Sequence, residues 1–290
     1  MPAQFVTIWS PALRGLALAG LFAAAIPLSA APATAARSTI DTCIAPDISN
    51  ELRVEGCTDV LKSRKATKRE QVVAYCNRGY SLTELKQYDR VIADSNAAIR
   101  IDPKEPCGYL NRGRAFFYKR NIDRAITDYT QTIKLDPTYH EAYANRGAAY
   151  HERHEFARAI PEYDAAIRIE PGIAMYHKDR ANSLYYMHEY ARAIADLVNA
   201  IKLDPKDAEL YARRGDNYTA LADYDRAIAD YTKAIELSPE DLRFWHAREK
   251  AHEANNEPEQ ALADHNEALR LEAGRFQSLL KDAGVPTTNR

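Results

Sequence analysis

The chain has 290 residues and a net charge of −2, from 39 basic and 41 acidic side chains. Hydrophobic residues make up 46% and charged residues 28%, which is typical of a folded soluble protein and excludes a largely disordered one. The balanced charge provides no basic excess for binding nucleic acid or an anionic membrane surface, so neither is expected as a partner.

Residues 1–36 have the features of a secretory signal peptide. Arg14 provides the positive flank, an apolar run follows from Gly15 to Ile26, and Ala33-Thr34-Ala35 offers a cleavage site. Pro27 interrupts the run well short of the roughly 20 residues that a spanning helix needs, so an uncleaved anchor is the weaker alternative. We therefore expect export to the periplasm or out of the cell, with no stable membrane insertion after the signal is removed.

Residues 37–71 are predicted to form an N-terminal lead-in. We expect Ser38–Pro46 to be coil, and Asp47 or Ser49 to cap a helix that runs to about Arg64. The basic stretch Lys62–Arg69 that follows is interpreted as a solvated connection between two helices rather than a nucleic-acid site.

A unit of 34 residues recurs six times, and this period decides the fold class. An arginine keeps the step in every copy, at Arg78, Arg112, Arg146, Arg180, Arg214 and Arg248. A proline marks five of the copies, at Pro103, Pro137, Pro171, Pro205 and Pro239. The six copies are predicted to span 72–105, 106–139, 140–173, 174–207, 208–241 and 242–275.

Each copy contains two apolar stripes with helical spacing. In the third copy, Tyr143, Gly147 and Tyr150 lie on one helical face, and Ala159 and Tyr163 lie on a second. The small residues allow two backbones to approach closely, and an acidic residue followed by proline ends the second helix. Each copy is therefore predicted to be an antiparallel helix pair.

These residues resemble the tetratricopeptide repeat, whose signature combines aromatic residues, Gly, Ala and Pro at this period. The resemblance covers about 204 of the 290 residues, and the leader makes the chain similar to exported bacterial members of the family. It implies an all-α solenoid of six tandem helix-turn-helix repeats with an N-terminal lead-in helix. The last copy departs from the pattern at Glu249, Pro258 and Ala273, as expected of a terminal repeat.

A capping helix is expected after the last repeat, within residues 276–290. Phe276, Leu279 and Leu280 predict a short helix that covers the exposed end of the solenoid, before a loose tail from Val285 to Arg290.

The arginine of each copy lies beside the stripe that faces the partner helix, so its guanidinium needs an acidic partner. Acids follow at the same period: Asp94, Asp128, Glu162, Asp196, Asp230 and Asp264. We predict one arginine–carboxylate pair per repeat, including Arg112–Asp128, Arg146–Glu162, Arg180–Asp196 and Arg214–Asp230. The alternative is a ladder of arginines that binds an anionic ligand.

Four cysteines in an exported chain favour disulfides, and three pairings are possible. The preferred bridge joins Cys43 to Cys57, closing a loop of about 15 residues that contributes roughly 3 kcal/mol. Cys76 and Cys107 could also bridge if their Cα atoms lie within about 7 Å, and this stays open.

The sequence contains no recognisable catalytic or cofactor motif. His151 and His154 approach ligand spacing, but no third metal ligand follows at a recognisable offset. Neither a glycine-rich phosphate loop nor a nucleophile elbow is present. We expect a protein that is not an enzyme and that has no metal or cofactor.

In the family that the chain resembles, the second, fifth, ninth, twelfth and thirteenth places of each repeat line the concave groove. Carried onto this chain, these places predict a peptide groove lined by Tyr80, Leu110, Arg114, Phe117, Tyr118, Ala144, Ala148, His151, Met175, Lys178, Asn182, Tyr185, Tyr186, Asp216, Arg243, His246 and Lys250. Lys178 and Asn182 also match part of the clamp with which some members hold a peptide C-terminus. Arg213 and Arg243 would substitute for two further clamp residues.

Two functions follow from the resemblance. The favoured hypothesis is a non-catalytic scaffold or adaptor in the cell envelope, whose groove binds a peptide or a partner helix. The alternative is a ligand-binding or enzyme-accessory module that recognises an acidic polymer or a glycan through Arg114, Lys178, Arg213, Arg243 and Lys250.

Overall fold

The computed structural model describes residues 39–283, and this part of the chain is helical, without a strand. It divides into two compact units, residues 1–153 and 154–290, so the third repeat is split between them. The predicted all-α solenoid of tandem helix pairs is confirmed. The predicted signal peptide at 1–36 and the tail at 285–290 lie outside the described residues.

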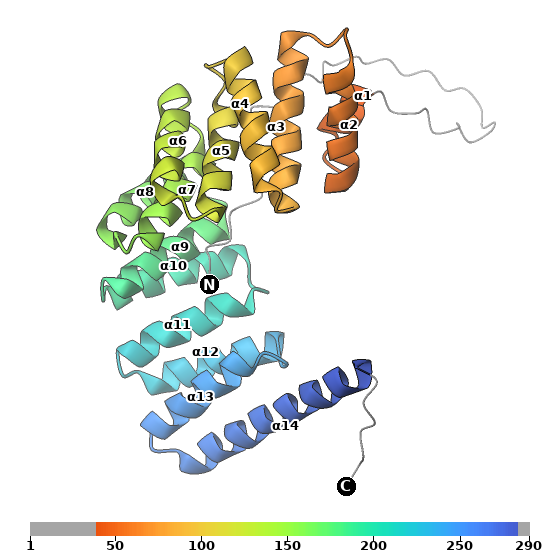
Figure 1. Cartoon of the computed structure of the whole chain (residues 1–290). Helices are drawn as coiled ribbons and strands as arrows, with labels where there is room; N and C mark the ends of the chain where they lie inside the picture. Colours follow the sequence, from red (N-terminus) through yellow and green to blue (C-terminus); the bar gives the residue numbers. More distant parts are fainter. Residues whose placement is uncertain (1–38, 284–290) are drawn as a thin grey trace, which may run out of the picture. The chain divides into compact units, whose positions relative to one another are not determined.

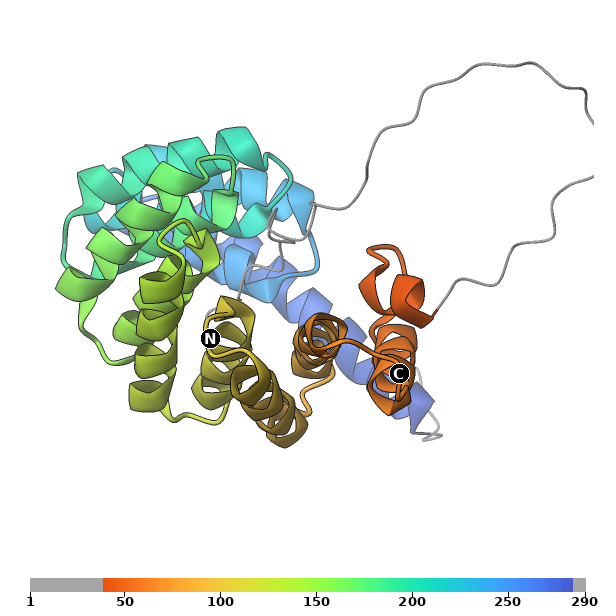
Figure 2. The ribbon, with the colours of Figure 1, turned by 90° about the horizontal axis from the view of Figure 1, so that it is seen from above.

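The first unit contains seven of the helices in the described range (Figure 1). They are α1 (Thr39–Ile44), α2 (Asn50–Lys62), α3 (Lys68–Glu84), α4 (Tyr88–Ile101), α5 (Pro106–Tyr118), α6 (Ile122–Leu135) and α7 (His140–Glu152). Ser49 caps α2 as predicted, and Thr67 forms a capping box with Glu70 at the start of α3. Helices α1 and α2 pack beside α3 (Figures 1 and 2).

The second unit contains the other seven helices of the described range. They are α8 (Phe156–Ile169), α9 (Ala174–Tyr186), α10 (Tyr190–Leu203), α11 (Ala208–Ala220), α12 (Tyr224–Leu237), α13 (Leu242–Ala254) and α14 (Pro258–Asp282). From α8 to α14, each helix packs against the next in the chain.

The first helices of successive repeats form the inner layer of each unit. In the first unit α3 contacts α5 and α5 contacts α7, and in the second α9 contacts α11 and α11 contacts α13. Within the described part of the second unit, α10 and α12 make no such contact with each other. The first helices therefore lie closer together than the second helices, and their free sides form the inner face of each unit.

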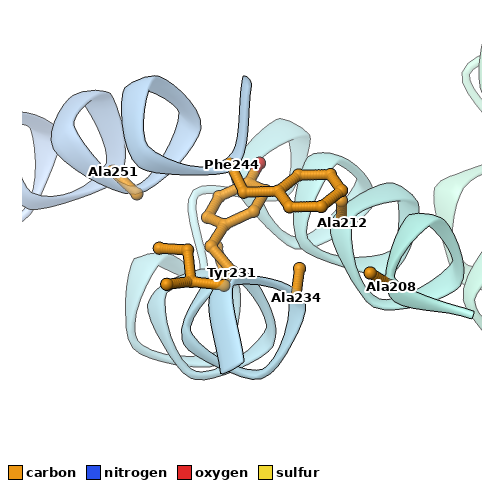
Figure 3. Close-up of a cluster of buried hydrophobic side chains, with 8 residues drawn as sticks. Ala208, Ala212, Tyr231, Ala234, Phe244 and Ala251 are labelled. Atoms are coloured by element: carbon orange, nitrogen blue, oxygen red, sulfur yellow. The ribbon is translucent and has the colours of Figure 1, made fainter. Parts of the chain in front are cut away.

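Aromatic side chains fill the space that small residues leave between the helices. In the second unit, Tyr231 and Phe244 pack with Ala212 and Ala251 in one buried cluster (Figure 3). A Cβ at Gly215 would lie 2.7 Å from the ring of Tyr231, which is closer than real Cβ contacts. The small residue at the eighth place is therefore required by the tyrosine of the following helix.

The turn inside each repeat contains a residue with left-handed backbone. Six residues spaced by 34 have φ between 57° and 61°: Lys86, Arg120, His154, His188, Ala222 and Asn256. At Ala222 the N–H donates to the carbonyl of Thr219, and the next N–H, of Asp223, donates to that of Tyr218, both at 2.9 Å. This is the Schellman arrangement, which normally has glycine at the left-handed residue.

We expect Ala222→Gly to stabilise the protein by up to about 1 kcal/mol. A left-handed conformation costs an L-residue roughly 1–2 kcal/mol, and the greater freedom of glycine in the unfolded chain offsets part of the gain. Urea denaturation of the full chain measures the change. Ala195→Gly, in the exposed interior of α10, is the matched control and should destabilise by about 0.5–1 kcal/mol. Equal losses from both variants would contradict the prediction.

The segment that was predicted to be coil at 38–46 contains α1. A helix of 6 residues is too short to be stable alone. Cys43 is fully buried, however, in a cluster with Cys57, Val60 and Ala74, and these tertiary contacts hold the turn. The prediction was wrong here because it relied on the local sequence.

The predicted separate capping helix is also wrong. Helix α14 runs without a break from Pro258 to Asp282, because Ala273 occupies the place where the other repeats have the proline that ends the second helix. The side chains of Phe276 and Leu279 are exposed on this extension and do not cover the end of the unit.

All four cysteines are bridged. Cys43 pairs with Cys57 across a Cα–Cα distance of 4.5 Å. Cys76 pairs with Cys107 across 5.9 Å, which joins α3 to α5 and settles the pairing that the sequence left open.

Candidate functional site

Five of the six periodic arginines contact the acid that lies 16 residues further along the chain. Arg112 and Asp128 lie 2.8 Å apart, Arg214 and Asp230 lie 2.7 Å apart, and Arg180 contacts Asp196. In each case Nε and Nη2 of the arginine donate to the two carboxylate oxygens. The same contact occurs at Arg78–Asp94 and Arg248–Asp264. Arg146 and Glu162 belong to different units, so their pairing stays a prediction.

These pairs hold the two helices of a repeat together. Burial by itself raises the pKa of Asp196, but the hydrogen bonds from Arg180 and the nearby imidazole of His177 outweigh burial, and the pKa lies below its usual value. The carboxylate therefore stays ionised and keeps the guanidinium occupied. Because carboxylates occupy these guanidinium groups, the paired arginines do not form a ladder that is open to an anionic ligand.

In the first unit, several residues predicted to line the groove are part of the core instead. Leu110 and Phe117 belong to a buried hydrophobic cluster, and Phe117 is only 1% exposed. Ala144 and Ala148 are buried as well. The groove prediction was wrong for these residues because neighbouring first helices pack closely enough to cover them.

Arg114 is also buried, at 4% exposure. Its Nη2 lies 3.1 Å from Glu84, and its guanidinium lies 5.3 Å from the ring centre of Tyr80. Tyr118 stacks on Tyr88 with ring centres 5.1 Å apart. These predicted groove residues are occupied by contacts within the unit, and His151 is half-buried.

A pocket of the first unit lies at the helix ends, and its lining contains none of the predicted groove residues. Its volume is about 400 Å³, and its lining includes Lys68, Arg69, Glu105 and the Cys76–Cys107 disulfide. Burial raises the pKa of Glu105, and nearby Arg69 opposes that shift. The pocket adjoins two helix N-termini, but no described group in it points to a ligand.

The second unit presents an aromatic cluster where α8 begins and α9 ends. Tyr186, at the end of α9, is 52% exposed and stacks on Phe156 with ring centres 4.8 Å apart. Tyr185 packs edge-on against Tyr186 and Tyr190. Met187 adds an exposed apolar side chain at 39%. We call Phe156, Tyr185, Tyr186 and Met187 the aromatic patch.

Four of the five cations predicted to orient an acidic ligand, Arg114 among them, have a carboxylate partner among the described residues. Lys178 lies 3.5 Å from Asp207, Arg213 lies 2.9 Å from Glu209, and Arg243 lies 3.2 Å from the same Glu209. Arg213 also donates to Asn182 at 3.1 Å. Of the other predicted residues, Met175 is half-buried, His246 lies 3.1 Å from Glu249, and Lys250 is exposed.

A small pocket opens between α9 and α11, beside the aromatic patch. Its volume is about 120 Å³, and it is lined by Ala181, Asn182, Tyr185, Tyr186, Leu197, Arg213, Asp216 and Asn217. We call it the α9–α11 pocket. Asn217 was missed by the sequence, because the tenth place of the repeat is not among the groove positions of the family.

Asp179, on α9, has an unusual pKa. Burial raises it from 3.8 to about 7, although Lys178 and Arg213 act to lower it. In the preceding repeats the equivalent place is asparagine, at Asn145 and Asn111, and these are buried. Asp179 is therefore a carboxylate in a position built for a neutral side chain.

We expect Asp179→Asn to stabilise the protein at pH 8 but to have little effect at pH 5. An acid whose folded-state pKa lies above its unfolded value binds its proton more tightly when folded, so stability falls as pH rises from about 4 to about 7. Urea denaturation at both pH values measures the difference, and Asp207→Asn, which breaks the contact with Lys178 without removing Asp179, is the control. A difference that does not change with pH would contradict the assignment.

Two kinds of site are missing from the described residues. No group of three or more His, Cys, Asp or Glu side chains within 39–283 could hold a metal ion, apart from side chains left undescribed. Over the same range, no helix is both long and apolar enough to cross a membrane.

Models of the tetratricopeptide repeat match residues 72–105, 110–172 and 178–241. Among solved structures, MamA is 24% identical with a TM-score of 0.55, and the match covers 57% of this chain and 96% of that one. YrrB, described as a TPR protein with an unusual peptide-binding site, is 17% identical with a TM-score of 0.55, over 65% and 97% of the two chains.

A longer match is to the APC/C hetero-tetramer Cut9–Hcn1, at 18% identity and a TM-score of 0.61, over 83% of this chain and 49% of that one. No curated protein matches the chain. The structural likenesses establish the fold alone, whereas the matched repeats cover more than half of the sequence. The chain therefore belongs to the tetratricopeptide-repeat family.

Proposed function

We propose that the protein is a non-catalytic scaffold of the cell envelope that binds a peptide or a partner helix on the inner face of α9 and α11. The observation that carries this proposal is the aromatic patch. Large exposed apolar side chains are uncommon on the described first helices, yet the consecutive residues Tyr186 and Met187 at the end of α9 are both exposed. Tyrosines of this kind are the residues that most often anchor a protein partner.

The rigidity of the patch also supports binding. The stack on Phe156 and the edge-on contact with Tyr185 hold Tyr186 in place before a ligand arrives. A pre-ordered anchor loses little side-chain entropy on binding, so more of the contact energy appears as affinity. The peptide-binding site named for YrrB, a protein of the same fold, is consistent with this use.

Location in the envelope rests on two further observations. The leader at 1–36 has the pattern of a secretory signal. Both cysteine pairs are bridged, which suits an oxidising compartment outside the cytosol.

A pull-down from envelope extract tests the function. We expect wild type to retain a protein partner and the Tyr185→Ala, Tyr186→Ala double variant to bind that partner at least about tenfold more weakly, as for the loss of a binding hot spot. Leu203→Ala removes an exposed leucine from α10, on the other helix of the same repeat, and should leave the affinity unchanged. Retention of the partner by the double variant would contradict the proposed surface.

An acidic polymer or glycan is not supported as the ligand. Arg114, Lys178, Arg213 and Arg243 each pair with a carboxylate, and among the described residues only Lys250 of the predicted cations shows no such contact. Salt-sensitive glycan binding with an unchanged partner list would nevertheless overturn the scaffold proposal.

A further inference from the structure

The α9–α11 pocket contains a buried acceptor without a donor. Asn217 is 2% exposed, and its Nδ2 donates to the backbone carbonyl of Arg213 at 2.7 Å. Because a carbonyl can only accept, this bond fixes the orientation of the amide and identifies the other atom as Oδ1. Oδ1 has no hydrogen-bond partner among the described residues. A buried acceptor left unpaired is costly, so it favours a ligand that brings a donor.

Asp216 lines the same pocket and lacks a cationic partner. Its Oδ1 accepts a hydrogen bond from the hydroxyl of Tyr231 at 2.8 Å, and no described cation lies within ion-pair distance of it. Asp216 is an exposed residue, yet desolvation by the surrounding protein raises its pKa, and the hydrogen bond from Tyr231 and the charge of Arg213 only partly offset that rise. The nearest arginine, Arg213, is held by Glu209 and Asn182.

The charge around the pocket is negative overall. Three basic side chains on the inner face, Lys178, Arg213 and Arg243, are surrounded by five carboxylates. These carboxylates are Asp179, Asp207, Glu209, Asp216 and Asp241. The pairs leave Asp216 without a cation, and Asp179, with a pKa of about 7, is only partly charged at neutral pH. Asp216 is therefore the group that attracts an incoming positive charge and repels an incoming carboxylate.

The size of the pocket and its aromatic wall complete the argument. A volume of about 120 Å³ is smaller than the roughly 300–1,000 Å³ of small-molecule sites, so it suits one side chain. Tyr185 and Tyr186 form one wall, and aromatic faces attract ammonium and guanidinium groups.

We infer that the α9–α11 pocket binds a lysine or arginine side chain of the partner peptide, through Asp216 and the Oδ1 of Asn217. This inference rests on the proposed function and adds the chemistry of the partner. It reverses the expectation from the partial clamp match, in which the same surface would hold the carboxylate end of a peptide. The aromatic patch anchors the apolar part of the partner, and the pocket fixes its register.

An array of random dodecapeptides tests the inference with the folded protein. We expect the peptides bound by wild type to be enriched in arginine or lysine at one position, and Asp216→Asn to remove that enrichment. Asparagine can still accept the hydrogen bond from Tyr231, so the variant changes the charge with little change in packing. Glu236→Gln, an equal change on the exposed side of α12, should leave the enrichment intact.

A double-mutant cycle on one selected peptide measures the interaction energy between its cationic side chain and Asp216. Replacing its arginine by citrulline, which is neutral and nearly the same shape, should weaken binding to wild type by at least about tenfold. The same replacement should have little effect on binding to Asp216→Asn, because the interacting charge is already absent.

The outcomes separate this inference from the proposed function. Bound peptides without a cationic preference, or a preference that Asp216→Asn does not change, would overturn the pocket assignment while peptide binding stood. Failure to bind any peptide in the array would overturn both.

Discussion

Asp230→Ala is expected to lower the free energy of unfolding by about 3 kcal/mol or more. The variant leaves the guanidinium of Arg214 largely buried without its carboxylate, and breaking a buried ion pair from one side costs about 3–5 kcal/mol. Because stability in a solenoid is a sum of repeat and neighbour contributions, the loss should appear first in α11 and α12. Urea denaturation and hydrogen exchange of these helices measure it.

Two variants show whether the buried charge is the cause. Arg214→Met combined with Asp230→Leu removes both charges and fills the space, so it should cost less than Asp230→Ala alone. Glu236→Ala breaks the exposed contact with Lys233 and should change stability by less than about 1 kcal/mol. A loss from Asp230→Ala no greater than this exposed control would refute the prediction.

The period of 34 made the helices predictable, because the same packing contacts recur in every copy and require the same residue types. Tyr231 needs a small residue at Gly215, and Asp230 needs Arg214, so these residue types recur and can be read from one sequence. The left-handed turns could not be predicted in this way. Lys86, Arg120 and Ala222 hold φ near 60° through the surrounding hydrogen bonds and not through glycine.

The ends of the repeat array were harder to predict because they have no neighbour to impose the pattern. Helix α1 exists through its contacts with Cys57 and Val60, which no local pattern in 38–46 reveals. Helix α14 continues past residue 273 because the proline that would end it is missing. Helix α1 thus depends on residues that are distant in the sequence, and the length of α14 depends on a proline that the last repeat lacks.

The site was predictable in part, from the repeat positions that line the groove in other members of the family. Tyr185 and Tyr186 line the α9–α11 pocket, whereas Phe117 is buried in the core of the first unit. The sequence left Arg213 and Arg243 as candidates for an acidic ligand, but in the structure each contacts Glu209. Their neutralisation by Glu209 involves residues of two successive repeats and becomes visible only when those helices are placed side by side.

Replacing both Cys43 and Cys57 with alanine is expected to cost about 3 kcal/mol and to release α1. The bridge spans 14 positions, and closing a loop of about this length removes that much entropy from the unfolded chain. Both sulfurs are fully buried in the cluster that holds α1 against α2. Without the bridge, the backbone carbonyl of Ala45 should also lose its 2.8 Å contact with Nη2 of Arg53.

Hydrogen exchange distinguishes release of α1 from a general loss of stability. Amides of Thr39–Ile44 should lose their protection in the double variant, while those of α9 and α11 keep theirs. The matched control is Cys76→Ala with Cys107→Ala, which removes the longer bridge between α3 and α5. It should lower the free energy of unfolding by a similar amount, because the entropy term depends only weakly on loop length. The amides of α1 should stay protected from exchange. Persistent protection of Thr39–Ile44 without the first bridge would show that apolar packing alone holds this helix.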